Sequence, residues 1–177
     1  APDGKLATNG ICTGSHSQRE GYDMCPSQKF VQDVVAGQIN DILKSNTDYV
    51  QYFDQNIGGN CYMCYSKKHG HVAGPGKWQN EVMIKLYKRI QQLIDRSGKK
   101  MLIGCEGASA EPFLPYLLYN DLRYNVNYTL GKPVPAYSYI FHEYINNFMG
   151  NQVTATDGID MGKSPLNMNQ RVSLAFI

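Results

Sequence analysis

Residues 52–71, YFDQNIGGNCYMCYSKKHGH, bring together the side chains of this sequence that are best suited to chemistry. An apolar, strand-like run ends in the carboxylate of Asp54, and a glycine loop follows. Thiols and imidazoles come next, and these are side chains that zinc prefers as ligands. They are Cys61, Cys64, His69 and His71. The segment is therefore either a small zinc site or the rim of an enzyme pocket with Asp54 at its floor.

The spacing fits a zinc site only in part. Cys61-x-x-Cys64 followed by His69 begins a zinc-knuckle pattern, but the last ligand is then expected near position 74, which is Gly74. His71 would be a cramped substitute, because it is two residues from His69. Structural zinc also serves small folds that lack a core, whereas this chain has apolar helices and strands. We therefore expect no metal, and a Cys61–Cys64 disulfide or two packed thiols. The zinc set Cys61, Cys64, His69 and His71 remains the alternative.

Ionisable residues follow three successive predicted strands. Strands are predicted at 49–53, 101–105 and 136–141, and they end at Asp54, at Glu106 and at His142-Glu143. Ligands of parallel α/β folds bind at the carboxyl ends of the strands. Neighbouring strands lie about 4.8 Å apart, and the two carboxyl groups of a glycosidase lie about 5–10 Å apart. Asp54 and Glu106 are thus predicted to form a pair.

Helices are predicted before, between and after these strands. Apolar residues recur at helical spacing over 26–45, where Ser27 is placed to cap the helix, and over 78–96, which Gly98 is placed to end. A long loop, 55–76, separates the first strand from the second helix. Segment 110–122 is helix-like but carries Pro112 and Pro115. Weaker patterns indicate a strand at 7–12 and a helix from 165 to the end.

Alternation of helices with short apolar strands predicts the α/β class, with a parallel sheet buried on both faces. A closed (β/α) barrel of TIM type needs about 250 residues, and this chain of 177 offers three or four strands. We therefore expect a partial barrel, with residues 1–177 as a fragment of one catalytic domain. The rival, a complete doubly wound sheet, lacks a glycine-rich phosphate loop. Open strand edges would favour self-association.

The composition excludes some partners. Hydrophobic residues make up 42% and charged residues 18%, and the formal net charge is +2 without a basic cluster. We therefore expect no nucleic-acid partner. No apolar run approaches the roughly 20 residues of a membrane span, so no membrane partner is expected either. The thirteen tyrosines suit sugar recognition as well as core edges. On the third predicted strand, Tyr137 and Tyr139 would share a face.

Several stretches resemble a known family: GYDMCPSQKFVQDV, YFDQNIGG, CYMCYSKKHGHVAGPGKW, IGCEGASAE and PVPAYSYIFHEY, from about Gly21 to Gly150. They are similar to bacterial glycoside-hydrolase-like barrels that are catalogued largely as a domain of unknown function, with affinity to α-amylase-like and endo-α-N-acetylgalactosaminidase enzymes. In such barrels an Asp ends the fourth strand as nucleophile and a Glu ends the fifth as acid/base. The resemblance implies that these roles fall on Asp54 and Glu106.

The sequence therefore predicts part of a glycoside hydrolase that needs no cofactor and takes a carbohydrate substrate. Asp54 would attack the anomeric carbon or steer water to it, and Glu106 would protonate the leaving oxygen. The isolated chain is expected to be inactive, because a barrel site needs the ends of further strands. Two alternatives are a non-catalytic carbohydrate-binding barrel and a zinc-binding interaction domain. The expected sugar contacts are Tyr62, His69, His71, Trp78, His142 and Glu143.

Overall fold

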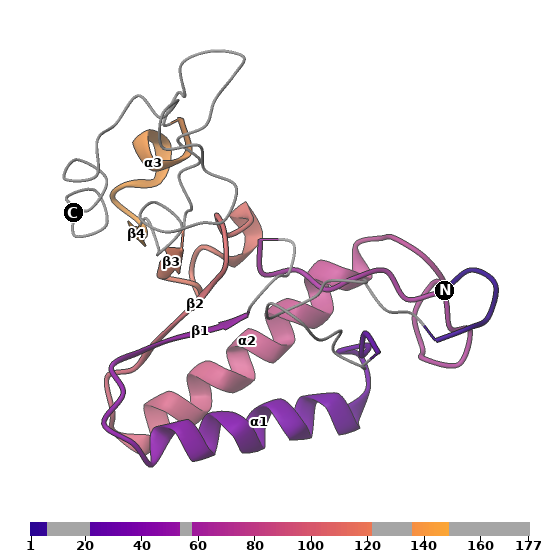
Figure 1. Cartoon of the computed structure of the whole chain (residues 1–177), viewed down its shortest axis with the longest axis horizontal. Helices are drawn as coiled ribbons and strands as arrows, with labels where there is room; N and C mark the ends of the chain where they lie inside the picture. The colour runs from indigo at the N-terminus through magenta and orange to yellow at the C-terminus, as the bar shows by residue number, and fades with distance from the viewer. Residues whose placement is uncertain (7–21, 54–57, 122–135, 149–177) are drawn as a thin grey trace, which may run out of the picture. The chain divides into compact units, whose positions relative to one another are not determined.

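A computed structural model describes residues 1–6, 22–53, 58–121 and 136–148 of the chain (Figure 1). These residues divide into two compact units. Unit 1 comprises Ala1–Asn46 and Asn60–Lys99, and unit 2 comprises Thr47–Gly59 and Lys100–Ile177. Within the described ranges, no helix has the length and apolar character needed to cross a membrane.

Unit 1 is built on two helices, α1 (Lys29–Leu43) and α2 (Trp78–Ser97), which pack along each other (Figure 1). Both were predicted from their apolar periodicity. The left-handed conformation of Gly98, with φ of 70°, ends α2 as expected. The apolar stripes of the two helices supply much of the core of this unit. Its buried helical residues are Val31, Ala36, Ile39, Leu43, Trp78, Met83, Leu86, Tyr87, Ile90 and Ile94.

The two helices run in the same direction. At their C-terminal ends, Lys99 Nζ donates a hydrogen bond to Ser45 O over 2.5 Å. Ahead of their N-terminal ends, Cys25 Sγ lies 3.3 Å from His71 Nε2. Along the chain, each of these helices is followed by one strand of a parallel pair.

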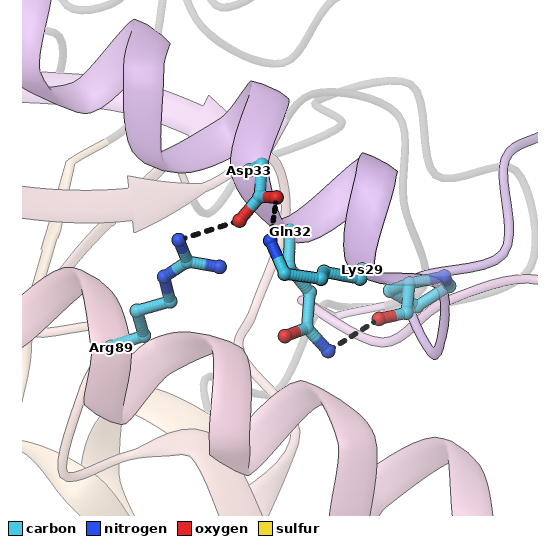
Figure 2. A network of polar contacts seen from close by, with 5 residues as sticks. Lys29, Gln32, Asp33 and Arg89 are labelled. Atoms are coloured by element: carbon cyan, nitrogen blue, oxygen red, sulfur yellow. Dashed lines mark hydrogen bonds and ion pairs between the residues drawn. The ribbon is translucent and has the colours of Figure 1, made fainter.

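Charged and polar side chains also join α1 and α2 (Figure 2). Arg89 Nη2 on α2 donates to Asp33 Oδ1 on α1 over 2.8 Å, and Lys29 pairs with the other oxygen of the same carboxylate. Gln32 Nε2 donates to Pro26 O over 2.9 Å, which holds the approach to α1 against its first turn. The two cations lower the pKa of Asp33 below its usual value, mainly through the hydrogen bond from Lys29.

Unit 2 contains the strands. β1 (Tyr49–Phe53) pairs in parallel with β2 (Leu102–Cys105), and β3 (Tyr119–Asp121) pairs in parallel with β4 (Asn146–Phe148). A parallel bridge between Glu106 and Asp121 links the end of β2 to β3. The parallel pairing of β1 and β2 is as expected, whereas the (β/α) barrel itself stays a prediction. The buried residues here include Ile103, Cys105, Phe113, Leu117, Asn120 and Ile145.

Two predicted elements of unit 2 are wrong. Residues 136–141, expected as a strand, form the helix α3 (Ala136–Phe141). The predicted helix over 110–122 is instead one 3-10 turn, η1 (Glu111–Phe113), followed by β3. Pro112 and Pro115 explain the second error, because proline inside a helix removes a hydrogen bond and clashes with the preceding turn. Aromatic alternation misled the first prediction, since strand propensity depends on having a neighbouring strand to pack against.

Two further predicted elements, the strand at 7–12 and the helix from 165 onward, lie outside the described residues. The long loop predicted after β1 has no helix or strand over its described part, 58–76. It is nevertheless organised, since Cys64 and Gly74 form an antiparallel bridge, with Gly74 N donating to Cys64 O over 2.8 Å. This bridge brings the two sides of the loop together.

Candidate functional site

Four potential metal ligands converge in unit 1. One atom from each of them, sulfur or ring nitrogen, lies within 4.8 Å of all the others. Cys25 Sγ is 3.3 Å from His71 Nε2, and Cys64 Sγ is 3.3 Å from His69 Nδ1. We call Cys25, Cys64, His69 and His71 the Cys–His cluster. Within the described residues, this is the group of histidine, cysteine, aspartate or glutamate side chains whose ligand atoms lie close enough together to hold a metal ion.

The backbone presents the members of the cluster from two segments. Cys25 lies just ahead of α1, where its carbonyl accepts a bond from Gln28 N over 3.1 Å. The other three lie in the loop before α2, inside the span closed by the bridge between Cys64 and Gly74. Gly74 has φ of 91°, a conformation that side chains disfavour. The loop therefore turns back on itself here and carries both histidines toward Cys25.

The ring of His71 is held on two sides. Its imidazole stacks on the indole of Trp78, with ring centroids 3.7 Å apart and planes 8° from parallel. Its Nδ1 lies 2.8 Å from Val72 O, and a carbonyl oxygen only accepts hydrogen bonds, so Nδ1 carries the proton. In the neutral imidazole Nε2 then has the lone pair, and this nitrogen faces Cys25. A histidine that ligates a metal is oriented by such a bond from its other nitrogen.

Ser27 and Gln28 support the cluster from the start of α1. Ser27 Oγ and Gln28 Nε2 each donate to His69 O over 3.2 Å, and Ser27 Oγ lies 3.1 Å from Cys25 Sγ. The prediction that Ser27 caps α1 is wrong. The N-cap position is Gln28 and has no side-chain cap. Burial raises the pKa of Cys25, with the adjacent Cys64 adding to the shift and Ser27 opposing it.

Cys61, which the sequence placed in the alternative zinc set, is not a member of the cluster, and Cys25 takes that place. Cys61 is buried, and burial raises its pKa to about 12. Both Cys61 and Cys64 are free thiols, as are Cys25 and Cys105, so the predicted disulfide is absent and the packed-thiol alternative holds for Cys61. The CxxC spacing was a misleading signal, because the sulfur that joins Cys64 comes from a distant segment.

The candidate catalytic carboxylates belong to unit 2. Phe53 of β1 is in register with Cys105 of β2, and Glu106 N donates to Phe53 O over 2.9 Å. Glu106 is half-buried. Asp54, the next residue after Phe53, lies outside the described residues. The strands that precede both acids are therefore parallel neighbours, with Phe53 and Cys105 paired after a register shift between Gln51 and Phe53. The distance between the two carboxylates stays a prediction.

The sequence missed a third acid, Asp121. It ends β3, forms the parallel bridge with Glu106, and is only 4% exposed. Gly107 N donates to Asp121 O over 2.7 Å, which fixes the backbone just after Glu106. Burial, together with the nearby Asp121 charge, raises the pKa of the Tyr49 hydroxyl. An acid after a short apolar run was a visible signal, but that run had been assigned to a helix.

A buried polar network lies behind the Glu106 segment. Cys105 N donates to Asn120 Oδ1 over 3.1 Å, and Asn120 Nδ2 donates to Leu117 O over 2.8 Å and to Ser109 Oγ over 3.3 Å. Tyr137 reaches this network from α3, its hydroxyl donating to Ser109 O over 2.8 Å. These bonds restrict the backbone on both sides of Glu106.

The remaining predicted sugar contacts are placed as follows. In unit 1, Tyr62 is half-buried, and Trp78 is 8% exposed, with one ring face against His71. His142 and Glu143 are exposed in the turn after α3, where His142 Nδ1 donates to Tyr139 O over 2.8 Å. They do not end a strand, which corrects the prediction. Tyr137 and Tyr139 do not share a face either, since Tyr139 is 79% exposed.

The described part of the chain thus defines an α/β protein with parallel strand pairs and a Cys–His cluster. By its sequence, the chain belongs to the family described as Domain of unknown function (DUF6259), whose profile matches residues 3–151. No curated protein and no solved structure matches the chain.

Proposed function

We propose that this chain carries part of the active site of a glycoside hydrolase, with Glu106 as general acid and Asp54 as nucleophile or base. The observation that carries the proposal is the register of β1 and β2. Phe53 and Cys105 are partners in a parallel pair, and the two acids are the residues that follow them. Ligands of parallel α/β folds bind at this end of the strands.

The surroundings of Glu106 support its role. It is half-buried, and its backbone is held from both neighbouring strands by Phe53 O and by the bridge to Asp121. A general acid must be positioned within hydrogen-bond reach of the leaving oxygen, so a restrained backbone favours this use. In this proposal the buried Asp121 is a positioning residue, because its backbone is bridged to Glu106 and accepts a hydrogen bond from Gly107 N.

The experiment is a screen of aryl glycosides and glycans with the full-length protein and with three single variants of it. Glu106→Gln and Asp54→Asn should each lower kcat by about 10²–10⁴-fold, the usual contribution of a positioned acid or base. Glu111→Gln is the matched control, since Glu111 is an exposed glutamate of the same unit. Turnover by Glu106→Gln at the level of the control would overturn the proposal.

Binding separates this proposal from a carbohydrate-binding barrel without activity. If a glycan from the screen binds but is not cleaved, and binds the Glu106→Gln and Asp54→Asn variants equally well, the acids have no catalytic role. A crystal structure with a bound glycan gives a second check. We expect the two carboxyl carbons within about 10 Å, the range of glycosidase pairs, and a separation beyond about 12 Å would contradict a shared mechanism.

A further inference from the structure

The Cys–His cluster presents two sulfur and two nitrogen ligands to a common centre, and it owes nothing to the proposed glycosidase chemistry. We propose that Cys25, Cys64, His69 and His71 form a structural zinc site that ties the approach to α1 to the loop before α2. Unlike the set suggested by sequence spacing, this site uses Cys25 in place of Cys61.

The distances between the ligand atoms are close to those of a tetrahedral zinc site. With Zn–S bonds of about 2.3 Å and Zn–N bonds of about 2.0–2.1 Å, neighbouring ligand atoms are roughly 3.3–3.8 Å apart. The two S···N pairs are each 3.3 Å apart, and the widest separation in the cluster does not exceed 4.8 Å. Zinc binding therefore requires small side-chain shifts and no rearrangement of the backbone.

The donor set selects the metal. Two thiolates and two imidazoles suit zinc, whereas magnesium and calcium require oxygen ligands. On binding, each thiol loses its proton to solvent and each imidazole binds through a neutral nitrogen. The bond from His71 Nδ1 to Val72 O already leaves Nε2 as the nitrogen that binds. Nδ1 of His69 is the nitrogen that faces Cys64 Sγ.

Four protein ligands complete a tetrahedral shell, so the site is closed and has no position for a substrate. Its effect is on the fold of unit 1. Cys25 and His71 are 46 residues apart in sequence, and zinc would join the segments that lead into two helices running in the same direction. The loop at 60–77 contains no helix or strand, so such a cross-link would supply order that its backbone hydrogen bonds provide only in part.

Ser27 supports the ligands without being one, and its effect on zinc affinity can be measured. Ser27 contacts both Cys25 Sγ and His69 O. Outer-shell partners of metal ligands change metal affinity by about 10–100-fold when they are removed. Ser27→Ala should therefore weaken zinc binding by that factor without abolishing it. Replacement of a direct ligand should remove stoichiometric binding.

The test uses the full chain, stripped with a chelator under reducing conditions and reloaded with zinc. We expect elemental analysis to find one zinc per chain in the unaltered protein. In Cys25→Ser and His71→Ala, the zinc content should fall well below one per chain. Cys61→Ser is the matched control, a buried cysteine of the same unit that is not in the cluster. His142→Ala is the matched histidine control, and both controls should retain the metal.

Cobalt gives a readout that does not depend on the folding of any variant. The unaltered chain loaded with Co²⁺ should show the visible bands of a tetrahedral ion and sulfur-to-cobalt charge-transfer absorption. Substoichiometric zinc together with an octahedral cobalt spectrum would overturn the proposal and leave a hydrogen-bonded thiol–imidazole cluster. One zinc per chain in Cys25→Ser would also overturn it. Loss of zinc from Cys61→Ser while Cys25→Ser retains the metal would do the same, and would support the ligand set Cys61, Cys64, His69 and His71 instead.

Discussion

The imidazole of His71 lies flat on the indole of Trp78, 3.7 Å between ring centroids, and the indole Nε1 donates to Gly74 O over 2.9 Å. One side chain thus orients a candidate zinc ligand and anchors the loop that carries it. The sequence had placed this tryptophan among sugar contacts. In the structure its indole packs against a member of the Cys–His cluster, and its part in sugar binding stays a prediction.

Two substitutions of Trp78 should separate the contribution of its packing to stability from that of its hydrogen bond. We expect Trp78→Ala to destabilise the chain by about 3–5 kcal/mol, the usual cost of deleting a buried aromatic side chain. Trp78→Phe retains an aromatic face for His71 but loses the bond to Gly74 O, so it should cost about 1 kcal/mol. Urea unfolding measures both. Tyr139→Ala is the control and should stay within about 0.5 kcal/mol, because Tyr139 is 79% exposed.

Gly104 and Gly37 should respond to alanine in opposite directions. A Cβ atom on Gly104 would meet Tyr119 O at 1.7 Å, so Gly104→Ala must displace β3 from β2 and should destabilise by several kcal/mol. Gly37 lies inside α1 with nothing within 4 Å of such an atom. Gly37→Ala should therefore stabilise the chain by about 0.5–1 kcal/mol. Thermal unfolding measures both, and a Gly104→Ala variant as stable as the unaltered chain would contradict the close contact of β2 and β3.

The ion pairs of Asp33 predict a pH dependence of stability. Lys29 and Arg89 hold the pKa of Asp33 below its value in the unfolded chain. The stabilisation is therefore present above the unfolded pKa, about 3.9, and is lost as the pH falls through the lower, folded pKa. We expect Asp33→Asn to flatten the dependence of the urea midpoint on pH in this acidic range. Equal pH profiles for the variant and the unaltered chain would show that this carboxylate is not coupled to folding.

Chelation should change the reactivity of particular cysteines. In the zinc-loaded chain, iodoacetamide should modify Cys25 and Cys64 slowly, since a metal-bound thiolate is shielded. A chelator should then accelerate modification at these two sites. Cys105 should stay slow in both states, because it is fully buried and burial raises its pKa to about 12. Mass spectrometry of the labelled peptides measures each rate. Modification rates of Cys25 and Cys64 that do not change when the chelator is added would contradict zinc ligation.

Local patterns were sufficient for the elements that depend on local causes. The periodicity of apolar residues located α1 and α2, and Gly98 located the end of α2, because helix faces and left-handed caps depend on residues a few positions apart. Strand β1 was predicted with its bounds, and β2 within one residue. Glu106 was also found from a local pattern, because it directly follows the apolar run that forms β2.

Tertiary structure decided the rest. Which cysteine joins Cys64, His69 and His71 depends on α1 and the loop before α2 being packed together, and the CxxC spacing carried no information about Cys25. The position of β3 depends on Tyr119 fitting against the bare backbone of Gly104, a contact between separate strands. Sequence alone thus determined the main helices, the β1–β2 strands and the residue types available for chemistry. Long-range packing determined which of those residues meet, because ligand geometry and strand neighbours are set by segments distant in the chain.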